Sequence, residues 1–173
     1  MGERGEVLIT VIGIILATIL MFVFPMAEIA QMNDKEIQAL IQSYTIEFVN
    51  KIRSTAMIDQ DEIDSFYQEL YSTGYSFEIE YEVHKADSNP GKKTEYVDIG
   101  DTTYYVMYTP QIQTHLENNG GKMQLKEGDY IVVYVKITST TMSQMFKSVL
   151  YGLTGDQAYL IFAQHSGPVL VTV

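Results

Sequence analysis

Cysteine and tryptophan are absent from this 173-residue sequence. The lack of cysteine excludes disulfide bonds, thiolate metal sites, a cysteine nucleophile and a lipid anchor attached to cysteine. Basic residues are scarce as well, since 11 Lys and Arg stand against 22 Asp and Glu and the formal net charge is −11. Such a chain repels nucleic-acid phosphates and has no polybasic segment to hold an anionic membrane surface. We therefore expect no nucleic-acid partner.

Catalytic motifs are also missing. The sequence has no P-loop, no GxGxxG, no GxSxG, no HExxH and no CxxC. The histidines His84, His115 and His165 are isolated from one another, and His165 and Ser166 are neighbours that would point to opposite faces of a strand. The sequence therefore predicts neither an enzyme nor a cofactor or metal site.

A long uncharged run is present near the start: 21 residues separate Glu6 from Glu28. As a helix this run would be about 31 Å long, which is the thickness of a hydrocarbon core. The hydrophobic part of a secretory signal is shorter, and cleavage after Ala27 or Ala30 would leave Pro25 or Glu28 at the third position back. A buried core helix is the alternative, but a small protein can hardly enclose a helix that is apolar all round. We predict an uncleaved transmembrane anchor over residues 1–30 and a separate domain over 31–173.

The short N-terminal tail favours a signal-anchor topology. The protein would then cross the cell membrane once, with a cytoplasmic N-terminus and an extracytoplasmic domain, although the distribution of Lys and Arg does not by itself favour either orientation. Within the anchor, Pro25 is expected to kink the helix or to loosen its last turn, and Gly13 is small enough to permit a close helix contact.

An amphipathic helix is predicted directly after the anchor. No glycine or second proline separates the two, so the anchor can run into this helix without a break. Polar residues occupy one side of the predicted helix, which would pack its other side on a sheet. The expected apolar stripe is Ile37, Leu40, Ile41, Tyr44, Phe48 and Ile52.

A cluster of acidic residues opens the next predicted helix, which ends at Gly74. Calcium binding is one interpretation, but the cluster lacks the glycine and the final glutamate of an EF-hand loop. Helix capping explains the cluster better: Asp59 or Asp61 would be the cap, with Glu62 as the capping-box partner of Asp59. The cluster consists of Asp59, Asp61, Glu62 and Asp64.

The remaining segments predict strands and two short helices. Residues 75–85 alternate between apolar residues and a solvated face of three glutamates and His84. We expect a loop at 87–93, a hairpin over 94–109, a helix at 110–120, a central strand at 126–140 and final strands at 158–164 and 168–173. The helix predicted at 141–153 would bury Met142, Met145, Phe146, Val149 and Leu150. The fold class is therefore α+β, in which a transmembrane helix continues into an amphipathic helix packed on an antiparallel sheet.

Four stretches carry a resemblance to a known group: GEVLITVIGIILATILMF, NPGKKT, QLKEGDYIVV and AQHSG. With them the chain resembles type IV pilin-like proteins, and more narrowly the small single-pass proteins encoded beside Tad-type (Flp) pilus machinery in Gram-positive bacteria. The resemblance implies a subunit of a pilus or secretion apparatus at the cell surface. Its partners would be the lipid bilayer, further pilin-like subunits and the platform proteins of the apparatus.

The resemblance also implies an assembly role for Glu6. Pilins carry a glutamate at the fifth position of the mature helix, and Glu6 takes this position if Met1 is removed. It would pair with the α-amino group or with Arg4 of a neighbouring subunit. The basic leader that a prepilin peptidase removes is not seen here. The alternative function is a membrane-tethered extracytoplasmic binding or sensory domain that does not polymerise.

Overall fold

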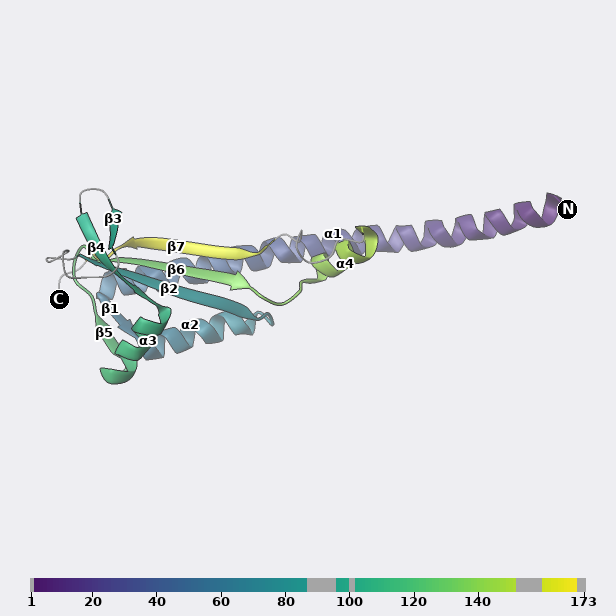
Figure 1. Ribbon diagram of the computed structural model, residues 1–173. Coiled ribbons are helices and arrows are strands. Elements are labelled where there is room, and N and C mark those ends of the chain that lie inside the picture. Colours follow the sequence, from purple (N-terminus) through teal and green to yellow (C-terminus); the bar gives the residue numbers. More distant parts are fainter. Residues whose placement is uncertain (1, 87–95, 100–101, 152–159, 171–173) are drawn as a thin grey trace. The chain divides into compact units, whose positions relative to one another are not determined.

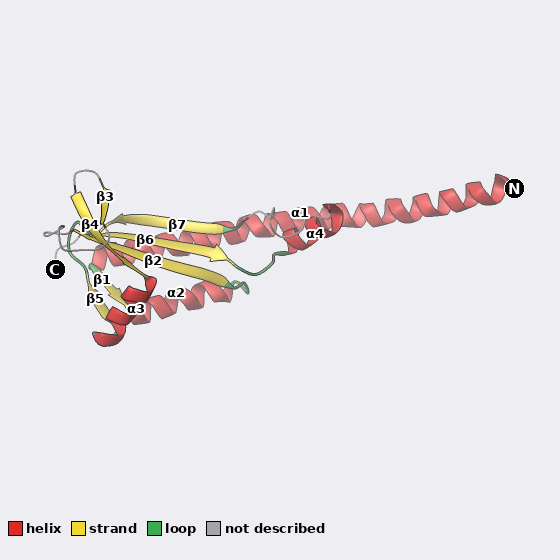
Figure 2. Ribbon diagram, viewed as in Figure 1, coloured by secondary structure: helices red, strands yellow, loops and turns green. Residues whose placement is uncertain are grey.

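The computed structural model describes the backbone of residues 2–86, 96–99, 102–151 and 160–170. The chain divides into two compact units: residues 1–36 and 140–159 form the first, and residues 37–139 and 160–173 form the second. Figures 1 and 2 label and colour the elements, which are in chain order α1 (Gly2–Thr55), β1 (Met57–Asp59), α2 (Gln60–Ser72), β2 (Phe77–Ala86), β3 (Tyr96–Ile99), β4 (Thr102–Tyr108), α3 (Thr109–Asn118), β5 (Lys122–Gln124), β6 (Tyr130–Ile137), α4 (Met142–Tyr151) and β7 (Phe162–Pro168).

Helix α1 is one continuous helix from Gly2 to Thr55, and Pro25 lies inside it. The prediction that the apolar run continues directly into an amphipathic helix is therefore confirmed. A proline inside a helix removes one backbone hydrogen bond, and the helix persists because neighbouring turns hold it. The boundary between the two compact units, after Glu36, falls within α1.

The second unit contains a five-stranded sheet with the strand order β3-β4-β2-β6-β7. Every neighbouring pair is antiparallel. The predicted α+β class is thereby confirmed. Strand β6 pairs on both of its sides, as expected for a central strand, and the predicted hairpin is formed by β3 and β4 with Ile99 opposite Thr102.

One face of the sheet carries the core of this unit. Phe48 of α1 stacks on Phe66 of α2 with ring centroids 4.4 Å apart, and it meets the ring of Tyr81 of β2 at 5.9 Å. Tyr67 of α2 also approaches Tyr81, at 6.5 Å. Helices α1 and α2 therefore cover the same face of the sheet, and aromatic rings fill the space between them.

The apolar stripe of α1 differs from the prediction at two positions. Ile37, Ile41, Phe48 and Ile52 are buried as expected, but Leu40 is exposed and Val49 is buried instead. The helix presents a stripe that follows its 3.6-residue period, and Leu40 lies just beyond the edge that the sheet and α2 cover.

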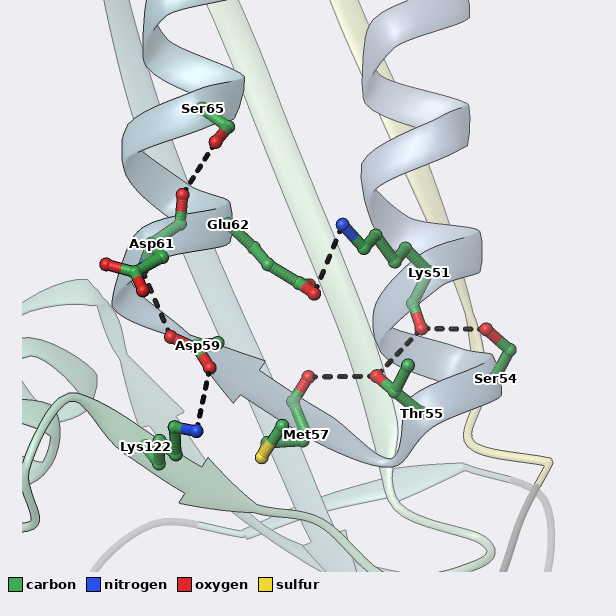
Figure 3. Close-up of polar contacts among 9 residues, drawn as sticks. All are labelled: Lys51, Ser54, Thr55, Met57, Asp59, Asp61, Glu62, Ser65 and Lys122. Carbon is green, nitrogen blue, oxygen red and sulfur yellow. Dashed lines mark hydrogen bonds and ion pairs between the residues drawn. The ribbon is translucent and has the colours of Figure 1, made fainter.

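The acidic cluster at the start of α2 forms local polar contacts (Figure 3). Asp59 is the N-cap, as predicted: its carboxylate accepts a hydrogen bond from the Asp61 N–H at 3.1 Å, and it also pairs with Lys122 at 3.4 Å. The capping-box role of Glu62 is wrong, because Glu62 forms an ion pair with Lys51 of α1 at 3.2 Å. The pair ties the first turn of α2 to α1.

Metal binding by this cluster finds no support in its geometry. Asp64 accepts a hydrogen bond from the Gln60 side chain at 2.8 Å, so its carboxylate stabilises the first turns of α2. Within the described part of the chain, no group of three or more His, Asp or Glu side chains is arranged to hold a metal ion.

A small second sheet was not predicted. Strand β1 pairs antiparallel with β5, and Ile58 lies opposite Met123. The chain enters β1 through Ala56, a buried residue with φ of 52°. The short helix α3 begins beside Pro110, as predicted, and Gly120 and Gly121 take positive φ angles just after its end.

In the last third of the chain, the structure differs from the predictions for the final strands and for the buried face of α4. Strands were expected at 158–164 and 168–173, but the described residues form one strand, β7, from Phe162 to Pro168, and residues 158–159 and 171–173 lie outside what the structure describes. In α4 the residues Met142 and Met145 are exposed, although we predicted them in a buried face, and the polar residues Thr141 and Ser143 are buried. The predicted loop at 87–93 and the side chains of Val149 and Leu150 lie outside what the structure describes.

Candidate functional site

The apolar part of α1 is the most prominent candidate for function. It is long and apolar enough to cross a membrane, and none of its most apolar 18-residue window is buried within the protein. Two threonines interrupt its apolar surface, and both donate their hydroxyl protons to carbonyls one turn back, Thr10 to Glu6 at 2.9 Å and Thr18 to Ile14 at 2.8 Å. A hydroxyl bonded in this way can face hydrocarbon without an unpaired donor.

The structure spreads the predicted assembly residues along this segment. Glu6, Gly13 and Pro25 are all exposed on α1, and no other side chain comes within 4 Å of a Cβ placed on Gly13. At about 1.5 Å per residue, Glu6 and Pro25 are about 29 Å apart along the helix. Arg4 belongs to the first turns of α1, but its side chain lies outside the described residues. These residues are therefore separate points on one surface rather than one site.

A second candidate is the open face of the sheet, opposite α1 and α2. Glu78, Glu80 and Glu82 of β2 lie on this face, as the alternation predicted, and β6 places Lys136 and Tyr134 opposite the first two. Lys136 pairs with Glu78 at 3.4 Å, and both side chains are exposed. Exposed pairs of this kind contribute little to stability, so this face keeps a negative character.

A groove of about 470 Å³ follows this row of glutamates. Its opposite wall is apolar and is formed by Leu160 and Phe162, each 57% exposed. Tyr134 lines it as well, and its pKa is raised, first by partial burial and then by the carboxylates of Glu82 and Glu80. A groove with one carboxylate wall and one apolar wall suits a ligand that carries positive charge on an apolar body.

His84 is buried, which contradicts its predicted place on a solvated face. It lies on the expected side of β2, but the rings of Tyr104 and Tyr130 stand beside it at 6.4 and 6.1 Å and leave only 7% of the residue exposed. Its Nε2 lies 3.2 Å from an oxygen of Glu82. Cross-strand neighbours decide such burial, and they are far apart in sequence.

Tyr130 also contacts β7, since its hydroxyl lies 3.1 Å from Ser166 Oγ. Ser166 is paired with Val132 and His165 with Val133, so the two neighbours take opposite sides of the sheet as the sequence predicted. Sequence reasoning missed the Glu82–His84–Tyr130–Ser166 row, because three strands contribute to it.

Comparison with known proteins gave no relative: no family model, curated protein or solved structure matches this chain.

Proposed function

We propose that this protein is a pilin-like, membrane-anchored subunit of a Tad or type IV-type pilus or secretion apparatus, and that it acts by assembly rather than catalysis. One observation carries the proposal. The same helix, α1, has an apolar half whose large side chains from Val7 to Phe24 are mostly exposed, and a second half that belongs to the core of an α+β unit. A subunit that moves from a membrane into a filament needs both halves.

The uncovered apolar surface requires an apolar environment. Each fully buried Leu, Ile or Phe side chain gains about 1.5–3 kcal/mol relative to water. Exposed side chains of this kind recur from Val7 to Met32, so the whole segment in water would be strongly unfavourable. A lipid bilayer and a bundle of helices from other subunits are the two environments that satisfy it. In this proposal the N-terminus is cytoplasmic and the sheet-bearing unit lies outside the cytoplasm.

Glu6 would set the stagger between subunits. It is exposed at the edge of the apolar surface, where a bilayer leaves it in contact with water. Inside a bundle of helices its carboxylate must find a cation or take up a proton. The cations at hand in an identical neighbour are the α-amino group and Arg4. Removal of one partner of a buried ion pair costs roughly 3–5 kcal/mol, so the pair would select one register.

The test replaces Glu6→Gln in the full-length protein, with Glu3→Gln as the control outside the apolar run. We expect both variants to insert into membranes and fold like the parent. Only Glu6→Gln should lose oligomers trapped by a membrane-permeable crosslinker and lose incorporation into filaments. Normal assembly of Glu6→Gln, or failure of the parent to associate with itself or with pilus proteins, would refute the proposal.

The groove on the sheet favours a second candidate function, a membrane-tethered domain that binds a ligand and does not polymerise. Its carboxylate wall and its apolar wall of Leu160 and Phe162 would hold an amphipathic cation. In this case the apolar part of α1 would remain permanently in lipid, and Glu6→Gln would have no effect on association. A parent protein that stays monomeric in the membrane would favour this function.

A further inference from the structure

Helix α4 presents its two methionines to the outside. Met142 and Met145 are 57% and 58% exposed, while Ser143 on the opposite side is buried. Water is an unfavourable environment for such a surface, so an apolar partner outside the described contacts should cover it.

The place of α4 within its unit points to that partner. Thr141, at the start of α4, donates its hydroxyl proton to the buried carboxylate of Asp34 in α1 at 3.0 Å. Asp34 follows directly after the last exposed apolar residues of the membrane-like segment, Ile29 and Met32. The contact therefore places the beginning of α4 at the level where the apolar surface of α1 ends.

Two N–H groups at the start of α4 find their acceptors within the helix itself. Thr141 and Gln144 form a reciprocal cap, in which Gln144 N–H donates to Thr141 Oγ1 at 3.3 Å and Thr141 N–H donates to Gln144 Oε1 at 3.1 Å. Such a cap lowers the number of donors that need water, which favours a position in a headgroup region where water is limited.

Charge separates α4 from the rest of this acidic chain. No aspartate or glutamate occurs between Asp129 and Asp156, and α4 itself carries one charged residue, Lys147. A net charge of −11 would keep most of the protein away from an anionic membrane, but this segment is not repelled.

We infer that α4 lies in the membrane interface, with Met142 and Met145 in the acyl-chain boundary, and fixes the depth at which α1 crosses. The inference rests on the proposed function, because it takes the apolar part of α1 to be a membrane span. An interfacial helix needs an apolar face and a polar or basic remainder, and α4 has both. Depth control follows from the Thr141–Asp34 contact, which links the interfacial helix to one point of α1.

The test uses the absence of cysteine, which allows single-cysteine variants of the full chain to be labelled cleanly with the polarity-sensitive dye NBD. The labelled sites are Met145→Cys on the proposed lipid-facing side of α4, Lys147→Cys about half a turn away, Phe22→Cys in α1 and Glu69→Cys in α2. Each variant is reconstituted in phosphatidylcholine–phosphatidylglycerol vesicles, and fluorescence is measured with and without doxyl-labelled lipid.

We expect a blue shift and loss of fluorescence by lipid quenching at positions 22 and 145, and neither effect at 147 or 69. Quenching at 22 without quenching at 145, or equal quenching at 145 and 147, would overturn the inference while leaving the anchor intact. No quenching at 22 would refute the membrane span itself. A blue shift at 145 that lipid quenchers do not reach would overturn the inference too, because a protein chain would then cover α4.

Discussion

Leu40 and Ile41 are neighbours in α1 with the same side-chain volume and very different surroundings. Ile41 is 0% exposed and belongs to the core under the sheet, whereas Leu40 is 36% exposed. At this scale the energy of a residue depends on what lies over it rather than on its own hydrophobicity, because stabilisation follows the apolar area removed from water.

We therefore predict that Ile41→Ala lowers the free energy of unfolding by about 2–5 kcal/mol, since it leaves a cavity in a closed core. Leu40→Ala should cost less, about 1 kcal/mol, because Leu40 lies at the edge of the core and the space that it leaves opens to solvent. Urea unfolding of the full-length protein in detergent micelles, followed by the near-ultraviolet circular dichroism of its tyrosines, measures both. Equal losses would mean that α1 is rotated relative to the structure.

The edge of β7 shows how one element protects another. Among the described strands β7 pairs with β6 alone, and α1 supplies side chains to its other edge. Gln38 accepts a hydrogen bond from the Phe162 N–H at 3.2 Å. Gln42 donates a hydrogen bond to the Gln164 carbonyl at 3.4 Å. Arg53 Nε donates one to the Pro168 carbonyl at 2.8 Å. These bonds occupy groups that an exposed edge would offer to a further strand, so they guard against edge-to-edge pairing.

Gly167 is the place where this arrangement is tightest. A Cβ at this position would lie 2.6 Å from both Nε and Cζ of Arg53. We predict that Gly167→Ala costs about 1–3 kcal/mol, because the added methyl group displaces a hydrogen-bonded guanidinium.

The cost of Gly167→Ala should largely disappear in an Arg53→Ala background, where nothing remains to clash. A double-mutant cycle by urea unfolding measures this coupling. Additive effects of the two substitutions would show that Arg53 does not lie across Gly167.

The whole molecule carries its charge unevenly. Its net charge is −11, yet residues 7–27 contain no charged side chain. Charged groups resist transfer into hydrocarbon far more strongly than apolar groups favour it, so the uncharged run is the segment best suited to a hydrocarbon environment.

We predict that the full-length protein stays with membranes through high-salt washing and needs detergent for release. Two lysines near the middle of the run, Ile15→Lys with Ile19→Lys, should move it toward the aqueous fraction, since each costs roughly 2.5–3.5 kcal/mol on insertion scales. The matched control is Ala39→Lys with Ser43→Lys, which makes the same change on exposed positions of the same helix. Release of the control, or of the parent by salt alone, would contradict a membrane span.

Protease added to intact, wall-stripped cells tests the orientation of the same protein. We expect the sheet-bearing unit to be degraded, because the proposed function places this unit outside the cytoplasm. Complete protection would place this unit in the cytoplasm.

The sequence by itself determined those features that depend on near neighbours. The apolar run of α1, the alternation of β2 and the Asp59 cap of α2 are local patterns, and together they specified an α+β fold with a long apolar N-terminal helix. Hydrogen bonds within a helix and the period of a strand involve residues a few positions apart, so their signals are readable in one sequence.

Only the tertiary structure decided what covers each apolar or polar side. It buried Val49 and exposed Leu40, enclosed His84 between tyrosines of two other strands, paired β1 with β5 and turned Met142 and Met145 outward. The acid-lined groove arises in the same way, from β2, β6 and the segment that leads into β7. A hydrophobic stripe tells which side of a helix avoids water, but its covering comes from segments distant in the chain or from lipid.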